Sequence, residues 1–148
     1  MDSLFGTDNM NTEEPEKVVS MDEAKKKIKP FHIWTVAGED HKMKLTTSQI
    51  IELEGKYRTN IMNMVIVDTV PALSIMLTIA KAAISPWEHG MTDIKIKKVY
   101  DKWMEADGGN QQKLYSDVII PTMAVSGFFT EEQANALLER IQDAKEML

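Results

Sequence analysis

The sequence predicts a mainly α-helical fold with a small N-terminal β-hairpin (α+β), arranged as a compact helical bundle behind a disordered N-terminal tail. Residues 31–36 are mostly β-branched or aromatic, and Met43 and Leu45 alternate with lysines on the return strand, as the strands of a half-buried hairpin do. From residue 46 onward, apolar residues recur at helical spacing instead. Helix-start patterns and proline or glycine stops separate these later segments, which therefore predict a series of helices.

Composition limits the classes of function. The 148 residues suit one domain, and the net charge of −6 argues against general binding to a phosphate backbone, which needs a positive surface. The absence of cysteine excludes disulfides, thiol nucleophiles and iron–sulfur clusters, and it fits a reducing cytoplasm. No secretory signal is visible, and the longest apolar run, residues 72–84, is shorter than the roughly 20 residues that a membrane span needs.

Residues 1–29 are predicted to form a flexible tail of acidic and mixed charge. The segment is polar and poor in aromatic side chains, so burial cannot offset the entropy lost on ordering. A capping pattern, S-x-x-E, allows a short helix over residues 21–28. The rest of the chain divides into a hairpin-plus-helix core at residues 30–129 and a C-terminal amphipathic helix at residues 130–148.

The predicted hairpin covers residues 31–45, with its turn at residues 38–40 (Gly-Glu-Asp). Because an isolated hairpin is only marginally stable, we expect it to pack on the helices that follow. Thr46 and Gln49 match a capping box, which predicts a helix start. Residues 59–70 fit either a short helix or an extended run, and we assign them to a helix.

Pro71 is predicted to occupy the first turn of the next helix, which continues through the apolar run at residues 72–84. This helix is apolar nearly all round, which places it at the centre of the fold or in an oligomer interface. Thr92 is expected to cap the following helix and the pair Gly108-Gly109 to end it.

The last third of the chain is predicted to be helical, with two interruptions. Pro121 should kink or split the helix over residues 110–125, because proline removes a backbone hydrogen bond. The tetrapeptide SGFF, residues 126–129, then breaks the helix. Thr130 and Gln133 form another capping box, which predicts the start of the final helix.

No catalytic or phosphate-binding motif is present, so we predict neither an enzyme nor a cofactor. Glu88 and His89 are a general acid–base pair by residue type, but adjacent side chains seldom point the same way. The corner around them is therefore interpreted as structural. Pro86 stops a helix and Trp87 packs into the core, while His89 bonds to the backbone and Gly90 supplies a positive φ. A small enzyme built around Glu88 and His89 is the alternative.

The remaining polar patterns have ordinary structural interpretations. His32 and His41 could face each other across the hairpin, but a metal would need a third ligand, so no metal site is predicted. The helix over residues 95–102 could read nucleic acid, yet nearby acidic residues favour a solvated face. The lysines of this segment are Lys95, Lys97, Lys98 and Lys102.

Four short pieces of the sequence carry a family resemblance through their order and spacing. They are Leu45-Thr46-Thr47, the corner at residues 86–90 with Met91-Thr92, the double glycine Gly108-Gly109, and Ser126-Gly127-Phe128-Phe129. In this order, over residues 31–129, they resemble the tail assembly chaperones of long-tailed (siphovirus-type) phages and prophages of Gram-positive bacteria. None of the four pieces is a catalytic motif.

The resemblance implies a role in virion morphogenesis without catalysis. Such chaperones bind the long, helical tape measure protein before the tail tube polymerises around it, engage tail tube subunits, and are absent from the finished tail. It thus implies a viral protein of the host bacterial cytoplasm with these two partners. Neither nucleic acid nor a membrane is expected as a partner, because of the acidic charge and the short apolar run. The alternatives are a small nucleic-acid-binding regulator that uses residues 95–102, or a structural tail component.

A partner groove is expected between two helices. The 11 methionines fit ordinary core packing, and they also suit a surface that must adapt to many similar apolar stripes, for which helix-in-groove docking is the natural mode. We also expect self-association along residues 72–84. The candidate partner-binding residues are Leu73, Ile75, Met76, Ile79, Tyr100, Trp103, Phe128 and Phe129.

Overall fold

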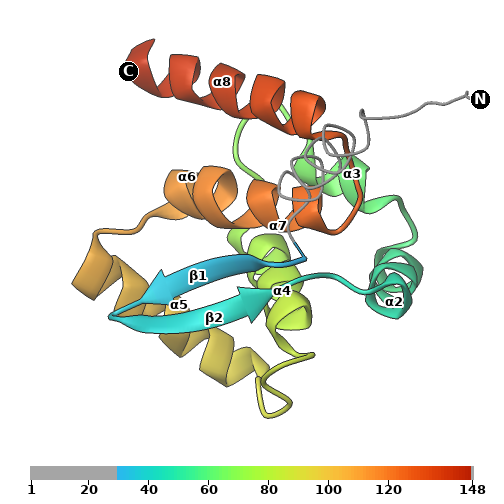
Figure 1. Cartoon of the computed structure of the whole chain (residues 1–148), viewed down its shortest axis with the longest axis vertical. Coiled ribbons are helices and arrows are strands. Elements are labelled where there is room, and N and C mark those ends of the chain that lie inside the picture. The colour runs from blue at the N-terminus through green and yellow to red at the C-terminus, as the bar shows by residue number, and fades with distance from the viewer. Residues whose placement is uncertain (1–29, 148) are drawn as a thin grey trace, which may run out of the picture.

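A computed structural model describes residues 30–147 and confirms a mainly helical fold with an antiparallel two-stranded hairpin at its start (Figure 1). The tail predicted for residues 1–29, with its short helix, lies outside the described residues. The elements are β1 (His32–Val36), β2 (Glu39–Met43), α2 (Thr47–Tyr57), α3 (Ile61–Val65), α4 (Leu73–Ile84), α5 (Asp93–Asp107), α6 (Gln111–Lys113), the π-helix η1 (Leu114–Ile119), α7 (Ile120–Val125) and α8 (Glu131–Met147).

The hairpin turn is Ala37-Gly38, with φ values of 51° and 83°. The prediction of a turn at residues 38–40 was wrong, because Glu39 already begins β2. Positive φ at both positions is what a type I′ turn requires, and that turn matches the twist of paired strands. The Ala37 N–H donates to Asp107 Oδ2 at 2.8 Å, which ties the turn to the end of α5.

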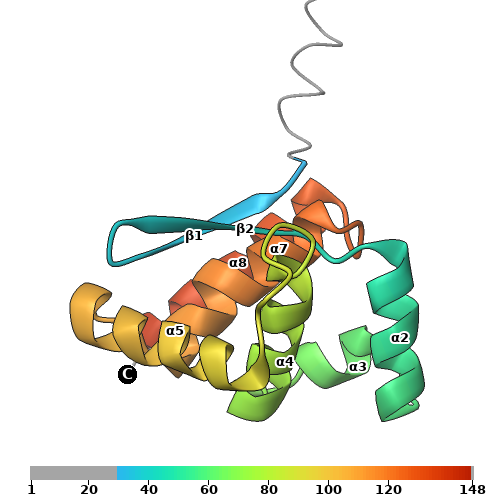
Figure 2. The same cartoon turned by 90° about the horizontal axis from the view of Figure 1, so that it is seen from below.

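One face of the hairpin packs on the helices, as Figure 2 shows from the side. Strand β1 lies against α5 and β2 against α4. Alternate residues point inward, so the predicted alternation is confirmed. The buried side chains are Trp34, Val36, His41 and Met43, and the exposed ones between them are Ile33, Thr35 and Lys42.

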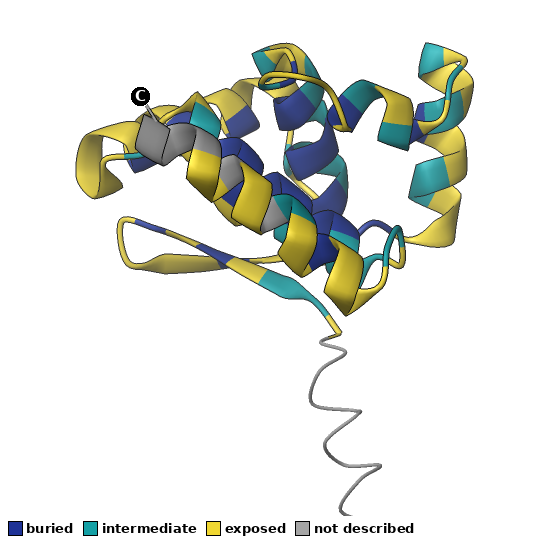
Figure 3. Ribbon diagram, turned by 90° about the horizontal axis from the view of Figure 1, so that it is seen from above, coloured by how far each residue is buried: buried dark blue, intermediate teal, exposed yellow. Residues whose placement is uncertain are grey.

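Helix α4 is the centre of the fold, as its composition predicts. It contacts β2, α5 and η1, and Met76, Ile79 and Ile84 are fully buried. Figure 3 shows the buried residues gathered at this centre, whereas α2 and α8 are largely exposed. Pro71 is buried but precedes the N-cap of α4, so its predicted place in the first turn was wrong.

The capping boxes predicted at Thr46 and Thr130 are confirmed. The Thr46 hydroxyl accepts from the Gln49 N–H while the Gln49 side chain accepts from the Thr46 N–H. Thr130 and Gln133 form the same reciprocal pair before α8. Of residues 59–70, only the five of α3 are helical.

Pro121 changes the helix before it without breaking it. Proline cannot donate to the carbonyl four residues back, and its ring collides with that carbonyl. The preceding turn widens into the π-helix η1, and the Ile120 N–H bonds to the Tyr115 carbonyl oxygen. The Tyr115 hydroxyl donates to the Val65 carbonyl oxygen at 2.7 Å, which holds this turn against α3.

Candidate partner-binding site

The corner at residues 86–90 differs from its prediction. Trp87 is 41% exposed, so its predicted place in the core was wrong, and its ring meets Phe31 edge-on with 5.7 Å between centroids. Gly90 does not have a positive φ. The chain reverses without it, because the Trp87 and Glu88 N–H groups both donate to the Ile84 carbonyl oxygen.

Glu88, not Trp87, is turned inward, where it meets His41. The distance from Glu88 Oε2 to His41 Nδ1 is 2.6 Å, and His41 is 4% exposed. Since a buried imidazole needs a hydrogen-bond partner, this pair fixes the α4–α5 loop against the hairpin. The sequence does hold a signal for it: His41 falls on the inward face of β2, two residues from Met43. His89 is exposed and does not form the pair considered with Glu88.

The histidines of the hairpin do not form a facing pair. His32 lies opposite Met43, and His41 lies opposite Trp34. Within residues 30–147, no group of three or more His, Cys, Asp or Glu side chains is placed to hold a metal ion. In the same part of the chain, no helix has both the length and the apolar character needed to cross a membrane.

The candidate partner-binding residues separate by burial. Met76 and Ile79 are 0% exposed, Tyr100 is 4% exposed and Trp103 is 7% exposed, so all four belong to the core. The Trp103 ring packs edge-on against Trp34 at 5.4 Å. The partly buried members are Leu73, Ile75, Phe128 and Phe129.

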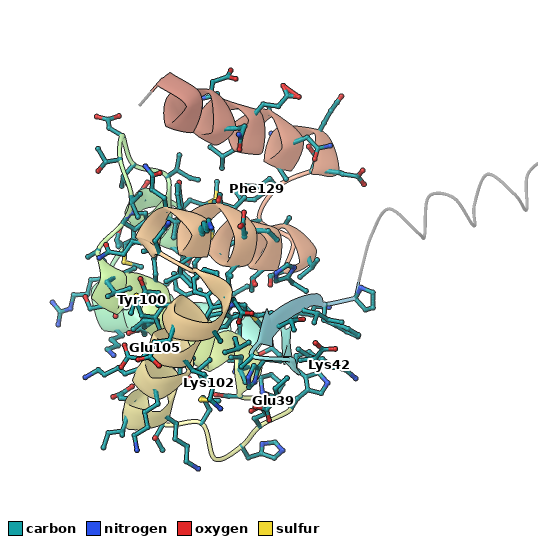
Figure 4. All side chains as sticks on the ribbon, turned by 90° about the vertical axis from the view of Figure 1, so that its left-hand side faces the viewer. Glu39, Lys42, Tyr100, Lys102, Glu105 and Phe129 are labelled. Carbon is teal, nitrogen blue, oxygen red and sulfur yellow. The ribbon has the colours of Figure 1, made fainter. Side chains whose placement is uncertain are left out.

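Phe128 and Phe129 lie at the junction of α7 and α8. The Phe128 N–H donates to the Met123 carbonyl oxygen and the Gly127 N–H to that of Ala124, which is a Schellman arrangement at a helix end. Gly127 has φ 90°, as that arrangement requires. Both phenylalanines pack against the core, and Figure 4 shows Phe129 between α7 and α8.

A hollow of about 480 Å³ lies between α4 and α5 and reaches the start of α6; we call it the α4/α5 hollow. Its size falls in the range of ligand pockets. The hollow lies where the sequence predicted a groove, although only two predicted residues, Leu73 and Tyr100, line it. Figure 4 labels Tyr100 where α5 meets α4. The lining residues are Leu73, Ser74, Leu77, Lys97, Tyr100, Asp101, Met104 and Gln111.

Two exposed apolar residues of α5 extend this surface. Ile94 is 66% exposed and Met104 is 37% exposed. Ile94, Lys97, Asp101 and Met104 follow one another at spacings of three or four, so they share one face of the helix. At 1.5 Å per residue, this face is roughly 15 Å long, enough to contact about three turns of a partner helix.

The rim of the α4/α5 hollow carries side chains of both charges, whereas its wall is uncharged. Lys97 and Asp101 place opposite charges on the rim. Asp93, one turn before Lys97, accepts a hydrogen bond from Lys81 Nζ at 2.8 Å, and this contact lowers the pKa of its carboxyl group. Burial raises the pKa of Tyr100, so its phenol stays neutral at physiological pH.

The lysines considered for nucleic-acid binding are all exposed on α5. Acidic side chains accompany them, since Asp101 precedes Lys102 directly and Glu105 follows it by one turn. Figure 4 shows Lys102 and Glu105 on this helix. The face therefore alternates in charge, as a solvated helix surface does.

Comparison of the chain with protein-family models, with curated proteins and with solved structures found no match.

Proposed function

We propose that this chain is a phage tail assembly chaperone, which binds the tape measure protein, keeps it soluble and helps to recruit tail tube subunits during tail morphogenesis. One observation carries the proposal: an apolar hollow lies between α4 and α5, the helices that the sequence predicted would form a partner groove. The resemblance of residues 31–129 to this class of chaperone supports it. The proposal places the protein in the host bacterial cytoplasm, outside the mature virion.

The α4/α5 hollow suits one ridge of an amphipathic helix. Leu73, Leu77 and Tyr100 offer a fixed apolar wall, because α4 and Tyr100 are anchored in the core. Met104 lines the open side, and a methionine adapts its shape to different side chains at low cost. The opposite charges of Lys97 and Asp101 favour no single charge pattern in the partner. Such a site fits many similar apolar stripes along one long helical protein.

Co-expression with the cognate tape measure protein tests the proposal. The wild-type chain should increase the soluble fraction of that protein. Ile94→Glu and Met104→Glu should lower it, because each places a charge beside the hollow where an apolar ridge would lie. Removing an anchor of this kind costs about 1–2 kcal/mol, roughly tenfold in affinity.

Ile51→Glu is the matched control. Ile51 lies on α2, outside the residues that line the hollow, and is 65% exposed against 66% for Ile94. This variant should keep the tape measure protein soluble. Equal loss in Ile51→Glu and Ile94→Glu would contradict the proposed site, and no effect of the wild-type chain would contradict the function. Detection of the chain in purified virions would favour a structural tail component.

A further inference from the structure

Met104 differs in exposure from the other methionines whose side chains the structure describes. Met104 is 37% exposed and lines the α4/α5 hollow. Three of the others are 0% exposed: Met43, Met76 and Met123. Another three are partly buried against the core: Met62, Met64 and Met91. Within this set, Met104 is therefore the methionine that water and small solutes reach most freely.

The environment of Met104 favours reaction with a dissolved oxidant. Methionine oxidation requires access to the sulfur atom, so burial protects a thioether. The Met43 sulfur lies in the core, where it accepts a hydrogen bond from Thr122 Oγ1 at 3.7 Å. Met104 instead lies on the open side of the hollow. Oxidation of the folded chain should therefore begin at the candidate partner site and leave the methionines of the core unchanged.

We propose that Met104 is a redox-modification site that controls partner binding at the α4/α5 hollow, an inference that rests on the proposed function. The oxidant is hydrogen peroxide. The Met104 sulfur attacks one peroxide oxygen, so that an S–O bond forms, the O–O bond breaks and the second oxygen leaves as water. The sulfur gives two electrons to the peroxide and becomes a sulfoxide, which methionine sulfoxide reductases convert back to the thioether.

The sulfoxide changes the chemistry of the hollow at the point where a partner docks. Leu73, Leu77 and Tyr100 form an apolar wall, and an apolar ridge seated on it would bury the new S–O group without a donor. Leaving a buried acceptor unpaired lowers the affinity by roughly tenfold. In the free chain the group stays in contact with water, because Met104 is exposed, so the fold should be unaffected.

Peroxide treatment of the full-length chain, followed by tryptic digestion and mass spectrometry, tests the modification site. Met104 is the one methionine of the tryptic peptide 103–113, so fragmentation of this peptide distinguishes its oxidation from that of Trp103. Met104 should oxidise about tenfold faster than Met43 and Met76. The far-UV circular dichroism spectrum of the oxidised chain should match that of the untreated chain.

Solubility of the cognate tape measure protein after dilution from urea tests the control of binding. Oxidation should raise, by roughly tenfold, the concentration of the chain that keeps half of that protein soluble. Met104→Gln, which is polar without peroxide, should have a similar effect. Met104→Leu is the matched control, because leucine keeps the site apolar but has no sulfur, and peroxide should leave its activity unchanged.

The outcomes separate this inference from the proposed function. Oxidation of Met104 no faster than that of Met43 would overturn the modification site. Full activity of the oxidised chain, or equal loss in peroxide-treated Met104→Leu, would overturn the control of binding while leaving the proposed function intact. An untreated chain that never keeps the tape measure protein soluble would contradict the proposed function, and the control of binding with it; the peptide map would still decide the modification site.

Discussion

Replacing Gly109 by alanine should destabilise the fold by about 2 kcal/mol, because the added Cβ has no room. That atom would lie 2.3 Å from Trp103 Cε3, 2.4 Å from Cδ2 and 2.7 Å from Cζ3. Carbon atoms pack at about 3.5–4.0 Å, so the indole ring would have to retreat by roughly 1 Å. Trp34 at 5.4 Å and Tyr100 at 6.0 Å block that retreat, since both rings are buried beside Trp103.

Urea unfolding followed by tryptophan fluorescence and by far-UV circular dichroism measures the effect. A loss of about 2 kcal/mol corresponds to a fall in Tm of about 6 °C for a chain of this length. Gly55→Ala is the matched control, because Gly55 lies within α2 with nothing within 4 Å of the added Cβ. The control should gain about 0.5–1 kcal/mol. If Gly109→Ala unfolds within about 0.5 kcal/mol of wild type, the packing argument is refuted.

Three other predictions concern polar contacts and backbone strain. Glu88→Ala should cost about 1–3 kcal/mol, because His41 stays buried without its partner, whereas His89→Ala at an exposed site should be nearly neutral in the same urea assay. Ala37→Asn should gain up to about 1 kcal/mol, because asparagine tolerates the positive φ of the turn and keeps the N–H donor; an unchanged midpoint would contradict this. Burial raises the pKa of Tyr115, so its contribution to stability is complete below about pH 10 and is lost as the pH rises through the raised pKa; Tyr115→Phe should flatten this decline in a pH series of unfolding midpoints.

The features predicted correctly are those encoded within a few neighbouring residues. The capping boxes at Thr46 and Thr130 and the stop at Gly108 need only a short pattern, because the contacts that they make are local. The position of Trp87 could not be predicted in this way, because residues close to it in the sequence do not determine it. Which side of the corner faces inward depends on His41, which lies 47 residues earlier and has Glu88 as its partner.

The residues of the candidate site likewise depend on contacts between distant segments, which the sequence does not show directly. A helix that is apolar nearly all round gives no sequence signal for the stripe that its neighbours cover. Met76 and Ile79 therefore looked equivalent to Leu73, although only Leu73 lines the α4/α5 hollow. Met104 was missed because it lies outside the regular apolar stripe of α5, and its place beside the hollow becomes visible only when α4 and α5 are packed together.

The most direct test of partner binding at the α4/α5 hollow is hydrogen–deuterium exchange of the full-length chain, alone and in complex with the tape measure protein. Exchange should slow on binding in the first half of α4 and along α5, with the exchange in α2 unchanged. Slower exchange confined to α2 or to the hairpin, with α4 and α5 unaffected, would contradict binding at this hollow.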